Sequence, residues 1–210
     1  MEAISNEDSL IYVTAELQYM MCNYQQAIAG LNTYLTSFCP GGRYCTNATY
    51  YAANSFYQLK QNEQAIEHFC TLADMQGNPY IEEACMRVAE LSSDKQEYRT
   101  ALYYYQRMSE VASSSSKRIT ALIGMLRCSH HLVEENNTTI DIATRLLNEP
   151  TLDSIVRNEA LYYRAKAYIK DKQYESLENT LHIYQNIINK CIEMIVMNND
   201  KILNHNKDNY

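Results

Sequence analysis

The sequence is poor in the residues that end or bend helices, with only 5 Gly and 3 Pro among its 210 residues. Strand-rich folds need many turns, and turns commonly use Gly and Pro. Their scarcity, beside a hydrophobic content of 46%, therefore indicates helices. The sequence also lacks an uninterrupted apolar run of the roughly 20 residues that a spanning helix needs, so we expect no membrane span.

Basic residues are also in short supply. The 18 Lys and Arg are spread among 25 Asp and Glu, which gives a formal net charge of -7. Phosphate backbones are bound by clustered Lys and Arg, so we expect no nucleic-acid partner. The chain begins with the polar, acidic sequence MEAISNED, whereas a secretory signal has a basic start and an apolar stretch. The sequence leaves the compartment open, and the absence of a signal in this chain favours the cytoplasm.

The seven cysteines are odd in number and irregular in spacing, which does not fit a disulfide framework. Most lie among apolar residues of predicted helices, where Cys acts as a small hydrophobe. We therefore expect buried thiols in a reducing setting. One alternative stays open: Cys39 and Cys45 flank the turn at residues 40–43 and could form a disulfide under oxidation.

Four short segments of the sequence resemble one another: residues 24–27, 62–65, 98–101 and 174–177. Each ends on Ala or Leu, and a bulky residue follows four positions later on the same helical face. Ala27, Ala65 and Ala101 are 38 and 36 residues apart, and 76 residues separate Ala101 from Leu177. The longer step leaves room for one divergent repeat.

A second series of small residues stands twelve positions before the first: Ala15, Ala53, Ala89 and Ala165. The pattern predicts a first helix, a short turn and a second helix, with small residues where the two helices approach each other. The three prolines fall between the predicted repeats, at positions 40, 79 and 150. Because proline cannot continue a helix, its placement supports this register.

The segment at residues 50–59, followed by 65–69, resembles the tetratricopeptide-repeat family. Ala53, Phe56, Ala65 and Phe69 match the family's small and aromatic positions, and Pro79 comes slightly late. The repeats here are longer than the family's, and Trp is absent. In length they look like the repeats of bacterial envelope proteins, such as outer-membrane assembly lipoproteins and the multi-repeat proteins of gut anaerobes. That likeness implies a periplasmic or outer-membrane-associated location as the alternative to the cytoplasm.

The resemblance implies an all-α fold, a right-handed α-α superhelix (solenoid) of about five helix-turn-helix repeats plus a C-terminal helix. We expect a single solenoid domain over residues 1–197. Its repeats would span about 9–40, 44–79, 80–115, 116–150 and 152–181, and a capping helix would span 182–197. The Asn-rich residues 198–210 would form a polar, disordered tail.

Tyrosine is unusually abundant, with 19 residues. At the family's packing positions, Tyr24, Tyr98, Tyr105 and Tyr174 are expected in the core. In the family, four positions of each first helix line a concave groove. At these positions the sequence has Glu83 and the following candidate binding residues: Tyr12, Glu16, Tyr19, Asn47, Tyr50, Asn54, Tyr57, Met86, Glu90, Met125, Tyr162 and Lys166.

These side chains suit a protein surface, because Tyr supplies contact area plus a hydroxyl and Met adapts to varied partners. The resemblance therefore implies a protein-protein interaction scaffold that binds a peptide or helical segment of another protein. None of the groove positions in the first three repeats is Lys or Arg, which argues against capture of a terminal carboxylate. The alternative function is a receptor that holds a short signalling peptide or a glycan in a closed pocket with convergent aromatic residues.

The sequence offers little for catalysis or for a cofactor. His130 and His131 are neighbours, so on a helix they point about 100° apart. Cys128 and His131 could supply half of a zinc site, but no second pair with suitable spacing is visible. Phosphate-binding loops and the common hydrolase motifs are absent. We therefore expect no enzyme activity, no cofactor and no metal.

Overall fold

The computed structural model describes residues 2–75 and 77–189, which are built from consecutive helices. The α-helices are α1 (Glu2–Met20), α2 (Tyr24–Phe38), α3 (Cys45–Gln58), α4 (Asn62–Asp74), α5 (Ile81–Asp94), α6 (Tyr98–Val111), α7 (Ser115–Ser129), α8 (Asn136–Leu147) and α9 (Ser154–Lys170). A 3-10 turn, η1 (Val133–Glu135), precedes α8. The described residues contain no strand, so the all-α helical-repeat fold expected from the sequence is confirmed.

Residues 174–189 form a further helix, which continues without a break across the expected boundary between 181 and 182. The rest of the expected capping helix, and the expected tail at 198–210, lie outside the described residues. Pro40, Pro79 and Pro150 all lie between helices, as the repeat register requires.

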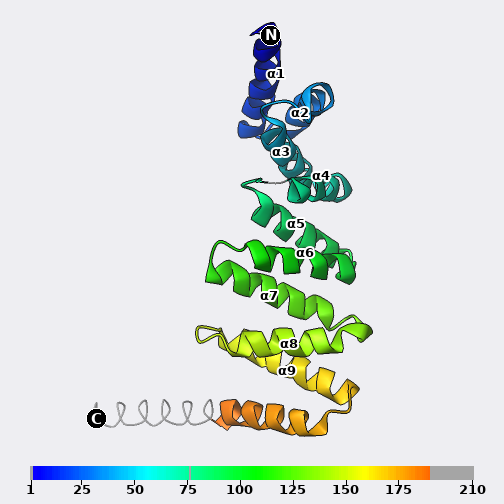
Figure 1. The fold of residues 1–210 in the computed structure, drawn as a ribbon, viewed down its shortest axis with the longest axis vertical. Coiled ribbons are helices and arrows are strands. Elements are labelled where there is room, and N and C mark those ends of the chain that lie inside the picture. Colours follow the sequence, from blue (N-terminus) through cyan, green and yellow to red (C-terminus); the bar gives the residue numbers. More distant parts are fainter. Residues whose placement is uncertain (1, 76, 190–210) are drawn as a thin grey trace, which may run out of the picture. The chain divides into compact units, whose positions relative to one another are not determined.

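The described residues form two compact units that divide between Cys128 and Ser129. In the first unit each helix from α1 to α6 packs against the next in the chain, and these helices stack in chain order (Figure 1). In the second unit α8 packs against α9.

The small residues that marked the repeats lie at close helix contacts. Ala53, Ala65, Ala89 and Ala101 are all fully buried. Gly30 on α2 faces Ala15 on α1, and a Cβ added at Gly30 would come within 2.8 Å of the Ala15 Cβ. Small side chains therefore set the distance between the paired helices, and the bulky core residues Phe69, Leu72 and Val88 fill the space beside them.

Four of the turns inside the repeats have the same backbone conformation. Each holds one residue in the left-handed region, with φ between 57° and 62°: Cys22, Lys60, Gln96 and Lys172. In each turn the next residue's N–H donates to a carbonyl five positions back, at 2.8–3.0 Å, as Gln61 does to Phe56. This is the Schellman ending of a helix, in which Gly is the usual left-handed residue.

Two expectations about individual residues are wrong. Tyr174, expected in the core, is 64% exposed. The expectation of buried thiols fails for Cys22, which is exposed, and for Cys39 and Cys45, which form a disulfide with a Cα–Cα distance of 5.7 Å. The alternative that the sequence left open for this pair is the one the structure adopts.

Candidate functional site

One continuous surface carries most of the candidate residues of the first three repeats. We call it the tyrosine face, and it comprises Tyr12, Glu16, Tyr19, Tyr44, Asn47, Tyr50, Tyr51, Tyr57, Tyr80, Glu83 and Arg87. On α3 the predicted positions 47, 50, 54 and 57 recur at steps of three and four residues, which places them on one side of the helix. Apart from the buried Tyr12, the members of the face are half-buried.

Stacked tyrosine pairs join successive repeats across this face. The ring of Tyr12 stacks on Tyr44 with centroids 4.3 Å apart, and Tyr50 stacks on Tyr80 at 3.9 Å. Tyr44 and Tyr80 each stand immediately before a first helix, α3 and α5 respectively. The same contact is therefore made twice, between a tyrosine on one first helix and the tyrosine that precedes the next.

Tyr44 and Tyr80 are not among the residues predicted from the sequence, because they lie outside the period of the first helices. The signal was present: both follow the Pro-containing connections between repeats, at equivalent places 36 residues apart. Their positions are fixed by the connections themselves. The Tyr44 N–H donates to the hydroxyl of the buried Tyr34 at 3.0 Å. The Tyr80 N–H donates to the side-chain oxygen of the buried Asn78 at 2.6 Å.

Two carboxylates accept hydrogen bonds from tyrosines of the face. The Tyr12 hydroxyl donates to Glu16 at 2.7 Å, and the Tyr50 hydroxyl donates to Glu83 at 3.0 Å. Burial, followed by these hydrogen bonds to carboxylates, raises the pKa of Tyr12 and of Tyr50 above the usual value. Burial likewise raises the pKa of Tyr51 to about 12, with Glu16 adding to the effect. The hydroxyls therefore stay protonated and act as donors at neutral pH.

The face ends beside a cation held over an aromatic ring. The guanidinium carbon of Arg87 lies 4.7 Å from the centroid of the Tyr57 ring, and Arg87 also forms an ion pair with Glu90 at 3.1 Å. Tyr57 is thus in contact with a cation that the protein itself supplies. Asn47 lies nearer the start of α3, where its side-chain oxygen is 3.5 Å from the Tyr80 hydroxyl.

Other predicted groove residues lie elsewhere. Asn54 and Met125 are buried, at 6% and 4% exposure, so they belong to the core rather than to a surface. The half-buried Met86 packs against the core cluster of α3 to α6. Tyr162 and Lys166 lie in the second unit, where Tyr162 is exposed and the Lys166 ammonium lies 6.0 Å from its ring centroid.

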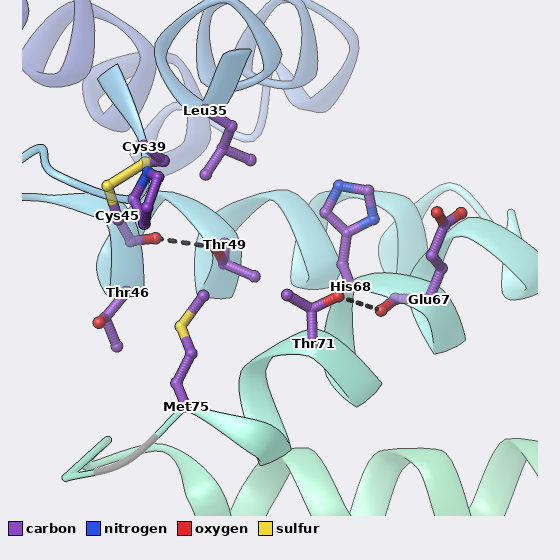
Figure 2. Close-up of a pocket in the computed structure, with 10 residues that line it drawn as sticks. Leu35, Cys39, Cys45, Thr46, Thr49, Glu67, His68, Thr71 and Met75 are labelled. Carbon is purple, nitrogen blue, oxygen red and sulfur yellow. Dashed lines mark hydrogen bonds between the residues drawn. A yellow bond between two sulfur atoms is a disulfide. The ribbon is translucent and has the colours of Figure 1, made fainter. Parts of the chain in front are cut away.

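A pocket of about 610 Å³ lies apart from the tyrosine face, between α2, α3 and α4 (Figure 2). The Cys39–Cys45 disulfide forms part of its wall, and the Thr49 and Thr71 hydroxyls donate to main-chain carbonyls of their own helices. No Phe, Tyr or Trp lines this pocket. It therefore lacks the convergent aromatic residues that a closed small-ligand pocket of the expected kind would have.

Two further observations concern the described part of the chain. It contains no group of three or more His, Cys, Asp or Glu residues placed to hold a metal ion. It also contains no helix whose length and hydropathy would let it cross a membrane.

Comparison with known proteins identifies the fold. No family model and no curated protein matches the chain. Among solved structures, one similar chain is YrrB, described as a TPR protein with an unusual peptide-binding site. It is 16% identical, with a TM-score of 0.54, and the match covers 82% of this chain and 81% of YrrB. Another is the MamA RS-1 ArsTM double mutant, which is 10% identical with a TM-score of 0.53, over 83% of this chain and 90% of that one. The chain therefore has the fold of tetratricopeptide-repeat proteins, as its sequence indicates.

Proposed function

We propose that this chain is a protein-interaction scaffold rather than an enzyme, and that it binds a peptide or helical segment of a partner on the tyrosine face. The observation that carries the proposal is the continuity of this face over α1, α3 and α5, through the stacked pairs Tyr12–Tyr44 and Tyr50–Tyr80. Half-buried tyrosines offer large, rigid contact areas with a polar end, and such residues dominate binding energy at protein interfaces.

The fold adds support, because YrrB, which shares it, is described as having a peptide-binding site. The proposal takes residues 1–197 as one repeat domain. We propose that Glu90 and the half-buried Met86, which lie on α5, extend the binding surface beside the tyrosine face. The pocket beside the disulfide gives less support to the alternative of a small-ligand receptor, since no Phe, Tyr or Trp lines it.

The test is site-specific photo-cross-linking in extracts of the source cell. A photoreactive phenylalanine analogue replaces Tyr57 on the face or, as the matched control, the exposed Gln106 on α6. Mass spectrometry then identifies the cross-linked segment. We expect one protein segment to be joined to position 57 and not to position 106. Cross-links of equal yield at both positions, or at 106 alone, would contradict the proposal.

A further inference from the structure

The electrostatics of the tyrosine face point to the kind of segment that it binds. Building on the proposed function, we propose that the partner is a basic segment, which places Lys or Arg side chains against Glu16 and Glu83 and over the stacked tyrosine rings.

Charge is distributed very unevenly over the helices that carry the face. Helix α1 has four acidic residues and no basic residue, and α3 has no charged residue at all. Helix α5 has four acidic residues and one basic residue, Arg87, which is already paired with Glu90. Arg43 and Lys60 flank α3 and lie over the Tyr44 and Tyr57 rings. On the helices that carry the face acidic residues nevertheless outnumber basic ones, which attracts a basic segment and repels an acidic one.

Glu16 and Glu83 differ from the neighbouring acids in their pairing. The Glu82 carboxylate is neutralised by Lys117 at 2.9 Å. Within residues 2–75 and 77–189, neither Glu16 nor Glu83 forms an ion pair. Their carboxylates accept hydrogen bonds from tyrosines: Glu83 from Tyr50, and Glu16 from Tyr12, with the Tyr51 hydroxyl also beside it. A carboxylate has about four acceptor sites, so each keeps capacity for a donor from outside. Both are half-buried, and partial desolvation strengthens a charge-assisted hydrogen bond.

The aromatic rings add a second preference for a cation. The face of a tyrosine ring attracts a guanidinium or ammonium group, and Arg is the commoner partner. The protein makes this contact itself at the edge of the face, where Arg87 lies over Tyr57. Tyr50 is stacked on Tyr80 and donates to Glu83. An incoming basic side chain can thus contact an aromatic ring and a carboxylate at the same place.

The experiment uses the full chain and a library of random peptides displayed on phage. Selected peptides are synthesised and titrated calorimetrically against the wild type, against a Glu16→Gln/Glu83→Gln variant, and against a Glu110→Gln/Glu178→Gln control. The control removes the same charge from two exposed positions off the face. Glutamine keeps an acceptor for the Tyr12 and Tyr50 hydroxyls, so the face should keep its packing.

We expect the selected peptides to be enriched in Lys and Arg over the starting library. We expect their binding to weaken at least about tenfold in the Glu16/Glu83 variant and less than about threefold in the control. Raising the salt concentration should weaken binding to the wild type more than binding to the Glu16/Glu83 variant.

The outcomes separate this inference from the proposed function. If the selected peptides are neutral or acidic and lose affinity in a Tyr50→Ala/Tyr57→Ala variant, the tyrosine face is still the binding surface. The inference of a basic partner would then be overturned. Basic peptides that bind all charge variants equally would also overturn it. Peptides whose affinity is insensitive to the tyrosine substitutions would contradict the proposed function itself, and failure to select any peptide would count against both.

Discussion

The hydroxyl of Tyr50 on α3 donates a hydrogen bond to the Glu83 carboxylate on α5, at 3.0 Å. Together with the stacking of Tyr50 on Tyr80, this contact ties two successive first helices together on the tyrosine face. The same tyrosine thus serves both as a structural link between repeats and as part of the proposed binding surface. Its hydroxyl performs the first role only while it is protonated.

Stability should therefore fall at alkaline pH. Burial raises the pKa of Tyr50, and it raises the pKa of Tyr51 and of Tyr105 to about 12. An unfolded tyrosine has a pKa of about 10. A pKa raised in the folded state stabilises the protein fully below the unfolded value, and that stabilisation is lost as pH rises through the folded value. Urea unfolding between neutral pH and about pH 11 should show a decline that begins near pH 10.

Replacing Tyr50 with Phe should make this decline shallower, because it removes one group whose pKa differs between the two states. The exposed Tyr103 provides the matched control, since Tyr103→Phe changes the same atoms at a residue that is 55% exposed. If the free energy of unfolding declined with pH at the same slope in the wild type and in Tyr50→Phe, the raised pKa of Tyr50 in the folded state would be contradicted.

The close approach of α1 and α2 gives a second prediction. In Gly30→Ala the new Cβ would come within 2.8 Å of the Ala15 Cβ, which cannot move without its backbone. Overpacking of this kind costs about 1–3 kcal/mol, against about 1 kcal/mol gained by exchanging Gly for Ala in a helix. We expect a net loss in the free energy of unfolding, measured by urea denaturation. Ala15→Gly should relieve the clash, so in the double variant the Gly30→Ala exchange should no longer destabilise.

Much of the fold could be predicted because small residues at helix contacts leave a pattern in the sequence. Ala27, Ala65 and Ala101 revealed the second helices, and all three are fully buried. Between Ala101 and Leu177, where the sequence leaves room for one divergent repeat, the 3-10 turn at Val133–Glu135 precedes α8. Tyr174 matched the same pattern and is nevertheless exposed, because a periodic position predicts a helical face but not whether another helix covers it.

The tyrosine face could be predicted only in part, for a physical reason. Its helical members, such as Tyr50 and Tyr57, follow from the period of the first helices. Tyr44 and Tyr80 are placed instead by hydrogen bonds in the connections, to Tyr34 and Asn78, and such contacts have no periodicity. The pairing of Tyr50 with Glu83 depends on the register between two helices, which the sequence of one helix does not specify.

The left-handed turn residues give a third prediction. Gln96 adopts φ 62° at the end of α5, where a side chain is strained and Gly is not. Gln96→Gly should therefore raise the free energy of unfolding, by up to about 1 kcal/mol. The matched control is Gln106→Gly at an exposed position inside α6, where Gly should cost about 1 kcal/mol. The difference in sign between these two substitutions is the test, measured by chemical denaturation of both variants.

The disulfide gives a fourth prediction. Cys39 and Cys45 close a short loop that contains Tyr44, the residue that stacks on Tyr12. By the entropy of loop closure, removing a crosslink of this span should cost about 2 kcal/mol. We expect Cys39→Ser/Cys45→Ser to lose this stability relative to the oxidised wild type. Once the wild type is reduced, the two proteins should have the same free energy of unfolding. Cys22→Ser, at an exposed free thiol, should leave stability unchanged under both conditions.

The final prediction separates binding from folding. Tyr50 and Tyr57 are half-buried on the tyrosine face, whereas Tyr34 is fully buried in the core of α1 to α3. Tyr50→Ala with Tyr57→Ala should weaken binding of the cross-linked partner segment by at least about 2 kcal/mol if either is a hot spot. Tyr34→Ala should cost about 3–5 kcal/mol of folding stability, as large-to-small core changes do. The Tyr50/Tyr57 variant should lose far less folding stability, because each side chain keeps part of its area in solvent.

Calorimetric titration measures the binding, and thermal melts of each variant measure the stability. Full affinity in the double variant would move the binding surface off this face, and an equal loss of stability in both variants would show that these tyrosines act as core.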